Sequence, residues 1–229
     1  MENLILYAPL LARGALVTIA LAVLSLAFAT ALGALGAAAR IAPGRVGRLI
    51  VTLYTTIVRG IPDLVLLLLV YFGGQRLLNV IAGWFGQDGA NISPFWAGVL
   101  SIGFIYGAYL TETFRGAFMT VPRGQIEAAE ALGLRGLALH WTVTIPQLVR
   151  FALPGYANVW QVLVKSTAVV SVIGLEDLVG LANDAGKTAR EPFIFFLAVL
   201  LVYLCITFVS TTIFEALERR SARGLNHAR

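Results

Sequence analysis

Charged residues are scarce in this sequence. Only 13% of its 229 residues are Asp, Glu, Lys or Arg, whereas 59% are hydrophobic. A soluble domain carries nearly twice that charged fraction, and so the composition excludes an ordinary soluble domain. No charge at all falls within residues 14–39, 89–111 or 192–214. Because a helix needs about 20 apolar residues to cross the hydrocarbon core of a bilayer, each of these runs is long enough to span a membrane.

Three further absences narrow the class. The apolar runs lack the alternation of apolar and polar residues that membrane β-strands show, and so the spans are expected to be helices. The single cysteine, Cys205, excludes an internal disulfide. His140 and His227 are isolated, so no metal cluster is expected, and no nucleophile–base pair stands out. The sequence therefore predicts an all-α membrane protein without catalytic residues.

Five transmembrane helices are predicted within a single domain that fills residues 1–229, with its core at about 12–215. The first span is expected to be permanent rather than a cleaved signal, because Glu2 precedes it and the apolar run is too long. Loops are expected at 79–93 and 175–191. The spans are expected at about 12–39, within 49–78, and at 94–119, 152–174 and 193–215.

The second span is predicted to be irregular. Residues 49–78 would extend about 45 Å as one straight helix, which is more than a single crossing needs. The segment RGIPD, from Arg59 to Asp63, interrupts it. Pro62 is expected to kink or break the helix there, because proline has no backbone N–H to donate. One alternative places the first part of this span near the membrane interface.

Basic residues are distributed unequally between the two sides of the predicted bundle. With the N-terminus outside, the inner segments hold eleven arginines and the outer segments hold four basic residues. Cytoplasmic loops carry an excess of Lys and Arg, and so the N-terminus is predicted to be periplasmic and the C-terminus cytoplasmic. The inner side then includes the polar segment 120–150 and the basic tail 216–229. The formal charge of +5 reflects these loops, and no nucleic acid partner is expected.

One short polar segment stands out between the third and fourth spans. Residues 124–133 read GQIEAAEALG, with two glutamates, strong helix formers and a closing glycine. As an ordinary amphipathic connector, this helix would pack Ile126 and Ala129 on the bundle and turn Glu127 and Glu130 toward water.

The spacing beyond this helix resembles a known pattern. The EAA loop of ABC importer permeases reads E-A-A, three residues, G, nine residues and I-x-L-P, and this chain has Val143 and Ile145 in place of the Ile and Leu. In that family the loop resembles a coupling helix that sits in a groove on the ATPase. The resemblance therefore implies a coupling role for five residues, which are Glu127, Ala128, Ala129, Gly133 and Pro146.

The resemblance extends over nearly the whole chain. The family is that of the polar amino acid permeases, and the chain is most similar to the Q subunit of importers for histidine, lysine, arginine and ornithine. The resemblance implies a type I ABC importer permease fold. It also implies four kinds of partner, namely an ATP-binding subunit dimer, a second permease subunit (an M-type homologue or a second copy), a periplasmic amino-acid-binding protein and an amino acid substrate. The segments that carry the likeness are RGIPDLVLL (59–67), YGAYLTETFRGAF (106–118), VPRGQIEAA (121–129) and residues 153–178.

An apparent phosphate loop fails on spacing. Gly186-Lys187-Thr188 would need the first glycine at position 181, but that residue is leucine and the glycine lies at 180. No cofactor is therefore expected in this chain, and ATP and Mg are expected on the partner ATPase.

Ionisable residues within the spans are candidates for the substrate path, because charge is costly inside a membrane. Asp63 follows the predicted break and would attract a cationic substrate; its alternatives are pairing with Arg59 and capping the next helix. Glu112 and Arg115 lie three residues apart on one helix face. They could form a local ion pair, or Glu112 could face the path.

Lys165-Ser166-Thr167 in the fourth span is the third candidate for the substrate path. Lys165 could attract a substrate carboxylate, although a structural ion pair is favoured slightly over direct contact. Glu176 and Asp177 begin the following loop, where they could form part of a docking surface for the binding protein or be solvated.

The small residues of the first span indicate close helix packing. Gly33 and Gly36 lie among alanines, and small residues allow two helix backbones to approach each other.

The sequence therefore predicts a permease subunit of an ATP-driven importer for polar, and within that class basic, amino acids. Opines and neutral polar amino acids remain alternatives as substrates. A different class, an ion-coupled secondary transporter or a channel, would use Asp63, Glu112 and Lys165 to carry ions. The EAA-like segment argues against that class, because a channel has no need of an ATPase dock.

Overall fold

The computed structural model describes residues 2–84 and 91–222, and this part of the chain is helical throughout, without strands. Seven predicted tail residues, 223–229, and part of the predicted loop 79–93 lie outside the described residues. The elements, in chain order, are α1 (Glu2–Ile41), α2 (Arg45–Gly60), α3 (Asp63–Trp84), α4 (Pro94–Thr120), α5 (Arg123–Ala131), α6 (Gly136–Leu139), the π-helix η1 (His140–Thr144), α7 (Ile145–Ser166), the 3-10 helix η2 (Thr167–Ile173), α8 (Leu178–Ala189) and α9 (Pro192–Ala222).

Five helical stretches of the described residues are long and apolar enough to cross a membrane. They confirm that there are five spans, with longer helices at both ends of the chain. The second span differs from its expected place within 49–78, because it is Asp63–Trp84 and the earlier residues form the separate helix α2. The first and fifth of these stretches each contain a whole charge-free run, and the third contains most of one. The stretches are Asn3–Ile41, Asp63–Trp84, Pro94–Thr120, Gly136–Ile173 and Pro192–Ser221.

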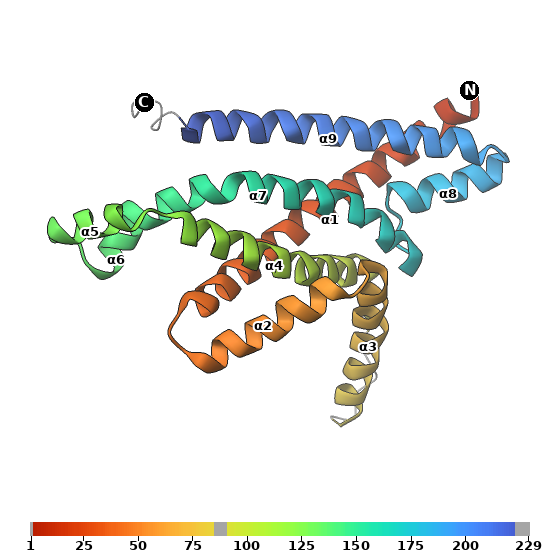
Figure 1. Ribbon diagram of the computed structural model, residues 1–229. Coiled ribbons are helices and arrows are strands. Elements are labelled where there is room, and N and C mark those ends of the chain that lie inside the picture. Colours follow the sequence, from red (N-terminus) through yellow and green to blue (C-terminus); the bar gives the residue numbers. More distant parts are fainter. Residues whose placement is uncertain (1, 85–90, 223–229) are drawn as a thin grey trace.

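The predicted break at Pro62 is present. α2 ends at Gly60, and Ile61 is extended, with φ −110° and ψ 140°. The residue before a proline is disfavoured in the helical region, and proline donates no backbone hydrogen bond. α3 then begins at Asp63 and leaves the bundle in a new direction (Figure 1).

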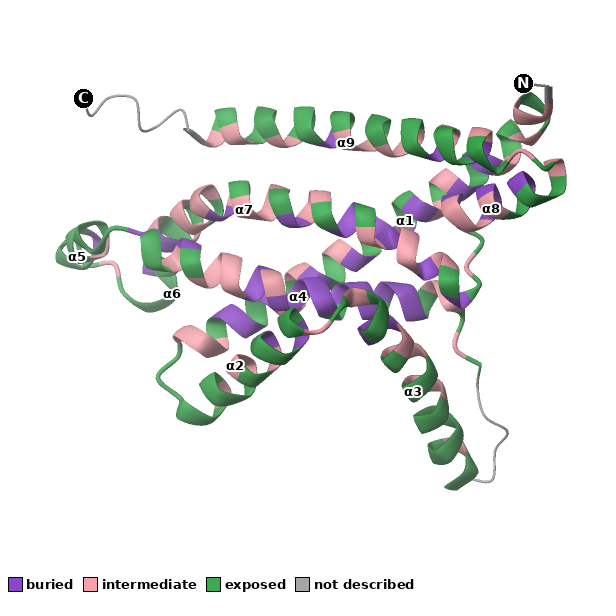
Figure 2. Ribbon diagram, turned by 45° about the vertical axis from the view of Figure 1, so that its right-hand side comes forward, coloured by how far each residue is buried: buried purple, intermediate pink, exposed green. Residues whose placement is uncertain are grey.

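α4 is the centre of the fold, and α3 is its least covered span. In the most apolar window of each helix, 67% of α4 is buried but only 11% of α3 (Figure 2). α1 crosses α4 closely, as the small residues predicted. A Cβ on Gly33 would lie 2.6 Å from the Leu110 Cβ, and one on Gly36 would lie 2.4 Å from the Thr111 Oγ1. These two glycines therefore allow α1 to approach the core helix closely.

Two predicted loops are partly helical, so those predictions were wrong in part. α3 continues to Trp84, six residues into the expected loop 79–93. The expected loop 175–191 contains α8, a helix of 12 residues. Its small residues fit against neighbouring helices: a Cβ on Gly186 would lie 3.0 Å from the Pro192 Cα of α9. Packing of this kind stabilises a helix that its own amino-acid composition does not predict.

The fourth span begins earlier than expected. α7 starts at Ile145 rather than near 152, and it continues into η2, which ends at Ile173 and is followed by Gly174 with φ +84°. The first turns of α1 and the last turns of α9 lie at opposite ends of the bundle (Figure 1). α8 lies at the same end as the start of α1, whereas α5, α6 and the end of α9 lie at the other (Figure 1).

Candidate functional site

The EAA-like segment forms a short helix that projects from one end of the bundle (Figure 1). α5 ends in a Schellman motif: Leu134 N donates to Ala129 O at 3.0 Å, and Gly133 N donates to Glu130 O at 2.9 Å. Gly133 has φ +87°, a conformation that glycine adopts without the strain a Cβ would add. The glycine of the motif is therefore required by the backbone that ends α5.

The surface of this projection combines charge with exposed apolar side chains. Glu127 and Ala128 are exposed, whereas Ala129 is buried against the rest of the segment. Leu132 is 84% exposed and Trp141 is 67% exposed. An exposed leucine at the end of this charged helix is available for contact with a partner.

A π-helix joins the projection to α7, and the sequence analysis did not anticipate it. In η1 the N–H of Ile145 donates to the carbonyl of His140, five residues back. Pro146 follows directly, and its ring has no N–H to donate to Thr142, four residues back. The proline of the EAA-like pattern thus marks the widened turn where the projection meets the span.

Glu112 is held by two arginines rather than one. Its Oε2 accepts hydrogen bonds from Arg115 at 2.9 and 3.0 Å, which is the expected ion pair within α4. Its Oε1 lies 3.1 Å from Arg40 Nη1 of α1, a partner that the sequence analysis missed. The sequence offered one sign that Arg40 is placed for a purpose, because it is the first charged residue after the long apolar run of the first span. Both carboxylate oxygens are engaged, and so Glu112 ties α1 to α4.

Asp63 lies at a junction of three helices. Its Oδ2 accepts hydrogen bonds from the Tyr106 hydroxyl of α4 at 2.8 Å and from the Ser166 hydroxyl of α7 at 3.1 Å. The alternative of an ion pair with Arg59 is not adopted: the Arg59 guanidinium carbon lies 5.2 Å from the centre of the Tyr109 ring. The structure brings Asp63 and Ser166 together, as two of the predicted path residues.

Lys165 and Thr167 point elsewhere. Lys165 is exposed and borders a cavity of about 410 Å³ between α7, α8 and α9, with no carboxylate partner among the described residues. The favoured reading of Lys165 as half of a structural ion pair was therefore wrong for this part of the chain. Thr167 is buried, and its hydroxyl contacts the Tyr203 hydroxyl of α9 at 3.1 Å.

The two acidic residues before α8 have different roles. Asp177 is fully buried, and its Oδ1 accepts a hydrogen bond from Gly180 N at 2.9 Å, which caps the start of α8. Burial raises the pKa of Asp177 above its usual range. Neither the docking nor the solvated reading therefore holds for Asp177. Glu176 remains exposed, 4.0 Å from Arg13.

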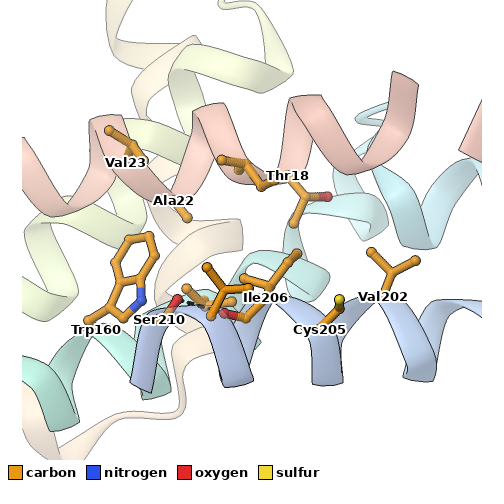
Figure 3. A pocket seen from close by; sticks show the side chains of 11 residues that line it. Thr18, Ala22, Val23, Trp160, Val202, Cys205, Ile206 and Ser210 are labelled. Atoms are coloured by element: carbon orange, nitrogen blue, oxygen red, sulfur yellow. Dashed lines mark hydrogen bonds between the residues drawn. The ribbon is translucent and has the colours of Figure 1, made fainter. Parts of the chain in front are cut away.

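A cavity of about 440 Å³ between α1, α7 and α9 is almost entirely apolar (Figure 3). Thr18, Trp160 and Cys205 are among its lining residues (Figure 3). This lining offers no charged partner for the charged groups of an amino acid, and so the charged residues around α4 are the better candidates for a path.

Comparison with known proteins gives the family. Residues 29–223 match the family described as binding-protein-dependent transport system inner membrane component. The chain belongs to this family.

Two relatives of this inner membrane component are permease proteins. The chain is 48% identical to the histidine/lysine/arginine/ornithine transport system permease protein HisQ of Salmonella typhimurium, over 94% of this chain and 95% of that protein. It is 41% identical to the octopine transport system permease protein OccQ of Rhizobium radiobacter, over 93% and 90%.

Solved structures give the same fold. An amino acid ABC transporter with histidines matches with a TM-score of 0.79 and 31% identity, over 96% of this chain and 97% of that chain. The MetNI methionine ABC transporter matches with a TM-score of 0.73 at 19% identity, over 93% and 96%, and shows the fold alone. The five apolar helices are thus those of an ABC importer permease.

Proposed function

We propose that this protein is the transmembrane permease subunit of an ATP-driven importer for polar, and specifically basic, amino acids. The observation that carries the proposal is the likeness to the Salmonella typhimurium permease over nearly the whole of both chains. The protein forms half of the translocation path in a bacterial inner membrane. It is not an enzyme, because hydrolysis of ATP with its Mg belongs to the partner subunits.

The proposed contact with the ATPase is the α5 projection. α5 is a short helix that begins after Pro122 and ends in the Schellman motif at Gly133. Because both of its ends are defined in this way, we expect α5 to move as a rigid body. Its exposed Glu127 and the neighbouring Leu132 offer charge and apolar area for a groove on the ATP-binding dimer. This assignment places α5 and the C-terminus in the cytoplasm and the start of α1 in the periplasm, in agreement with the distribution of basic residues.

The proposed contact with a second permease subunit involves α3. This helix is apolar and only 11% buried in its central window, and it leaves the bundle rather than packing along it (Figure 2). A second permease, either a copy of this chain or an M-type homologue, would cover it and close the path. The periplasmic binding protein would then deliver substrate at the end where α8 and Glu176 lie.

The proposed substrate class follows from the relatives and from Asp63. Relatives named for histidine, lysine, arginine and ornithine and for octopine have similar lengths. A carboxylate at the helix break favours a cationic side chain by Coulomb attraction. Stimulation of the ATPase by opines or by neutral polar amino acids, instead of basic ones, would correct this part of the proposal.

The test is ATPase activity in nanodiscs that contain this chain, its partner permease and the ATP-binding subunits. Binding protein loaded with arginine, histidine or glutamine is added in turn. We expect stimulation by the basic amino acids, loss of coupling in Glu127→Lys, and normal coupling in Glu218→Lys, which makes the same charge change on α9. Transport that collapses with a protonophore while ATP persists would instead indicate an ion-coupled transporter. Failure to associate with any ATPase would overturn the importer proposal.

A further inference from the structure

A surface groove lies where the end of α1 meets α4, η1 and the first turns of α7, at the end of the bundle that carries α5 (Figure 1). Its volume is about 570 Å³, within the range of small-molecule sites. Its lining includes Thr30, Ala34 and Ile41 of α1, Phe114 of α4 and Val149 of α7, and we call it the α1–α7 groove. The groove opens outward, because Ala34 and Val149 are exposed.

The interior of the groove suits a hydrocarbon chain. Its two threonine hydroxyls already have partners: Thr30 Oγ1 donates to Leu26 O at 2.7 Å and lies 2.9 Å from the Tyr156 hydroxyl. Thr144 Oγ1 lies 3.4 Å from His140 Nδ1. Alanine, isoleucine, leucine, valine and phenylalanine form the rest of the lining. A polar group that entered without a hydrogen bond would lose free energy of hydration, whereas an acyl chain has no polar group to desolvate.

The groove has the length and the depth of one leaflet of a bilayer. Along α1 it extends from Thr30 to Ile41, which is about 16 Å at the helical rise of about 1.5 Å per residue. Half of a hydrocarbon core that is about 30 Å thick is about 15 Å. Arg40 is the first charged residue after the charge-free run 14–39. The end of the groove at Ile41 therefore lies where the hydrocarbon core meets the lipid headgroups, and Thr30 lies near the middle of the bilayer.

An arginine lies at the mouth of the groove. Ala42, which lines the mouth, accepts a hydrogen bond from Arg48 Nη2 at 3.4 Å. Arg48 is exposed and forms no ion pair with a carboxylate among residues 2–84 and 91–222. The exposed Arg45 lies three residues earlier on the same face of α2 and adds positive charge. A guanidinium has five N–H donors in a plane that suits phosphate oxygens, and so most donors of Arg48 remain available for a phosphate.

We propose that the α1–α7 groove binds one acyl chain of an anionic phospholipid from the bilayer, and that Arg48 holds the lipid phosphate at the mouth. Basic residues beside a space between transmembrane helices are typical of sites for anionic lipid headgroups. A helix of a second subunit fits less well, because about 16 Å of a helix about 10 Å wide fills roughly 1,200 Å³, about twice the volume of the groove. The inference requires only that the apolar helices lie in a bilayer, and so it is independent of the importer proposal.

The test measures lipid binding to the full chain, purified with its partner subunits in mild detergent and stripped of lipid. Three probes separate the parts of the ligand. Phosphatidylglycerol has acyl chains and an anionic headgroup, phosphatidylcholine has the same acyl chains and no net charge, and glycerol 3-phosphate has the phosphate without the chains. The bound probe is counted by native mass spectrometry over a range of probe concentrations, which gives the affinity for each probe.

The unaltered complex should bind phosphatidylglycerol more tightly than phosphatidylcholine and should not retain glycerol 3-phosphate. Arg48→Gln weakens the binding of phosphatidylglycerol by about tenfold and leaves phosphatidylcholine unchanged, because a charge-assisted hydrogen bond to the phosphate is lost. Ala34→Phe weakens the binding of both lipids by about tenfold, because its ring fills the space of the acyl chain. Two matched controls change neither affinity: Arg220→Gln removes an exposed arginine of α9 at the same end of the bundle, and Leu35→Phe places a ring on exposed α1 surface outside the groove.

Other outcomes overturn the inference. Binding of glycerol 3-phosphate as tight as that of phosphatidylglycerol would indicate a site for free phosphate. If Ala34→Phe leaves both lipids unchanged but releases a second permease subunit, a helix of that subunit covers the groove. Equal losses in Arg48→Gln and Arg220→Gln would indicate a general attraction of anionic lipid to the basic surface. The same spectra show whether each variant assembles; if Ala34→Phe does not, Arg48→Gln decides alone, and an unchanged preference for phosphatidylglycerol refutes the inference.

Discussion

Asp177 should carry a measurable stability effect, because it is a buried carboxylate that also begins a helix. Its Oδ1 caps α8 through Gly180 N at 2.9 Å, and Thr18 of α1 accepts from Leu178 N at 3.2 Å next to it. Removal of the cap in Asp177→Ala should cost about 1 kcal/mol. Asp177→Asn keeps an oxygen that can cap the helix and removes the buried charge, and so it should be neutral or stabilising at pH 7.

The pH dependence has a definite sign. Burial raises the pKa of Asp177 in the folded state above 3.8, its usual value. Between the unfolded and folded pKa values the folded state binds more protons than the unfolded state, and so stability falls as pH rises through this window. Above the folded pKa the penalty is complete. The advantage of Asp177→Asn over the unaltered protein should therefore grow from low pH to a plateau.

Hydrogen exchange of the α8 amides in nanodiscs is the suitable assay, since it reports local opening of one element. A loss of about 1 kcal/mol in Asp177→Ala corresponds to roughly fivefold faster exchange in α8. Other helices should exchange at unchanged rates. If Asp177→Asn accelerated exchange as much as Asp177→Ala at pH 7, the charge itself would be stabilising and the reasoning would be refuted.

Three further substitutions test the packing and the projection. Gly36→Val places a side chain against α4 and should destabilise the fold by about 1–3 kcal/mol in thermal unfolding, whereas Gly47→Val, with no atom closer than 3.9 Å to its Cβ, should not. Gly133→Ala forces a side chain into a positive φ at a cost of about 1–2 kcal/mol; ATPase activity should then persist with less transport per ATP, and an unchanged ratio would contradict the coupling role. Glu112→Gln should lower the free energy of unfolding by about 1–3 kcal/mol, because two partly buried arginines lose their anion. The control Glu176→Gln should have little effect, because Glu176 and Arg13 form an exposed pair at 4.0 Å. Equal effects of the two substitutions would contradict this account.

The five spans and the break could be predicted because each follows from a local cost. Charge is expensive in a bilayer, and so the gaps in the charge pattern delimit helices. Proline removes a backbone donor wherever it falls, and so Pro62 divides the second span whatever lies around it. The helix end at Gly133 could likewise be predicted, because glycine readily adopts the positive φ that is found there.

The remaining features depend on neighbours that the sequence does not place. Residues 178–189 were expected to lie in a loop because this charged segment separates two apolar spans, yet α8 forms there because α1 and α9 pack against its small side chains. Arg40 and Glu112 are 72 positions apart, and no spacing rule links them; only the crossing of α1 and α4 does. The burial of Asp177 is likewise set by tertiary contacts rather than by its place after a span.

α4 connects α5, the proposed ATPase contact, with the tyrosine pair Tyr106 and Tyr109 in the core of the bundle. It carries Tyr106 and Tyr109 near its middle, Glu112 one turn later, and α5 after a connection of only two residues, Val121 and Pro122. It is also the most buried span, and tightly packed interiors transmit displacement rather than absorb it. A force that an ATPase applied to α5 would therefore reach the tyrosine pair through one continuous helix. Asp63 and Arg59 lie on either side of the break between α2 and α3 and contact these two tyrosines, and so a shift of α4 would move both contacts together.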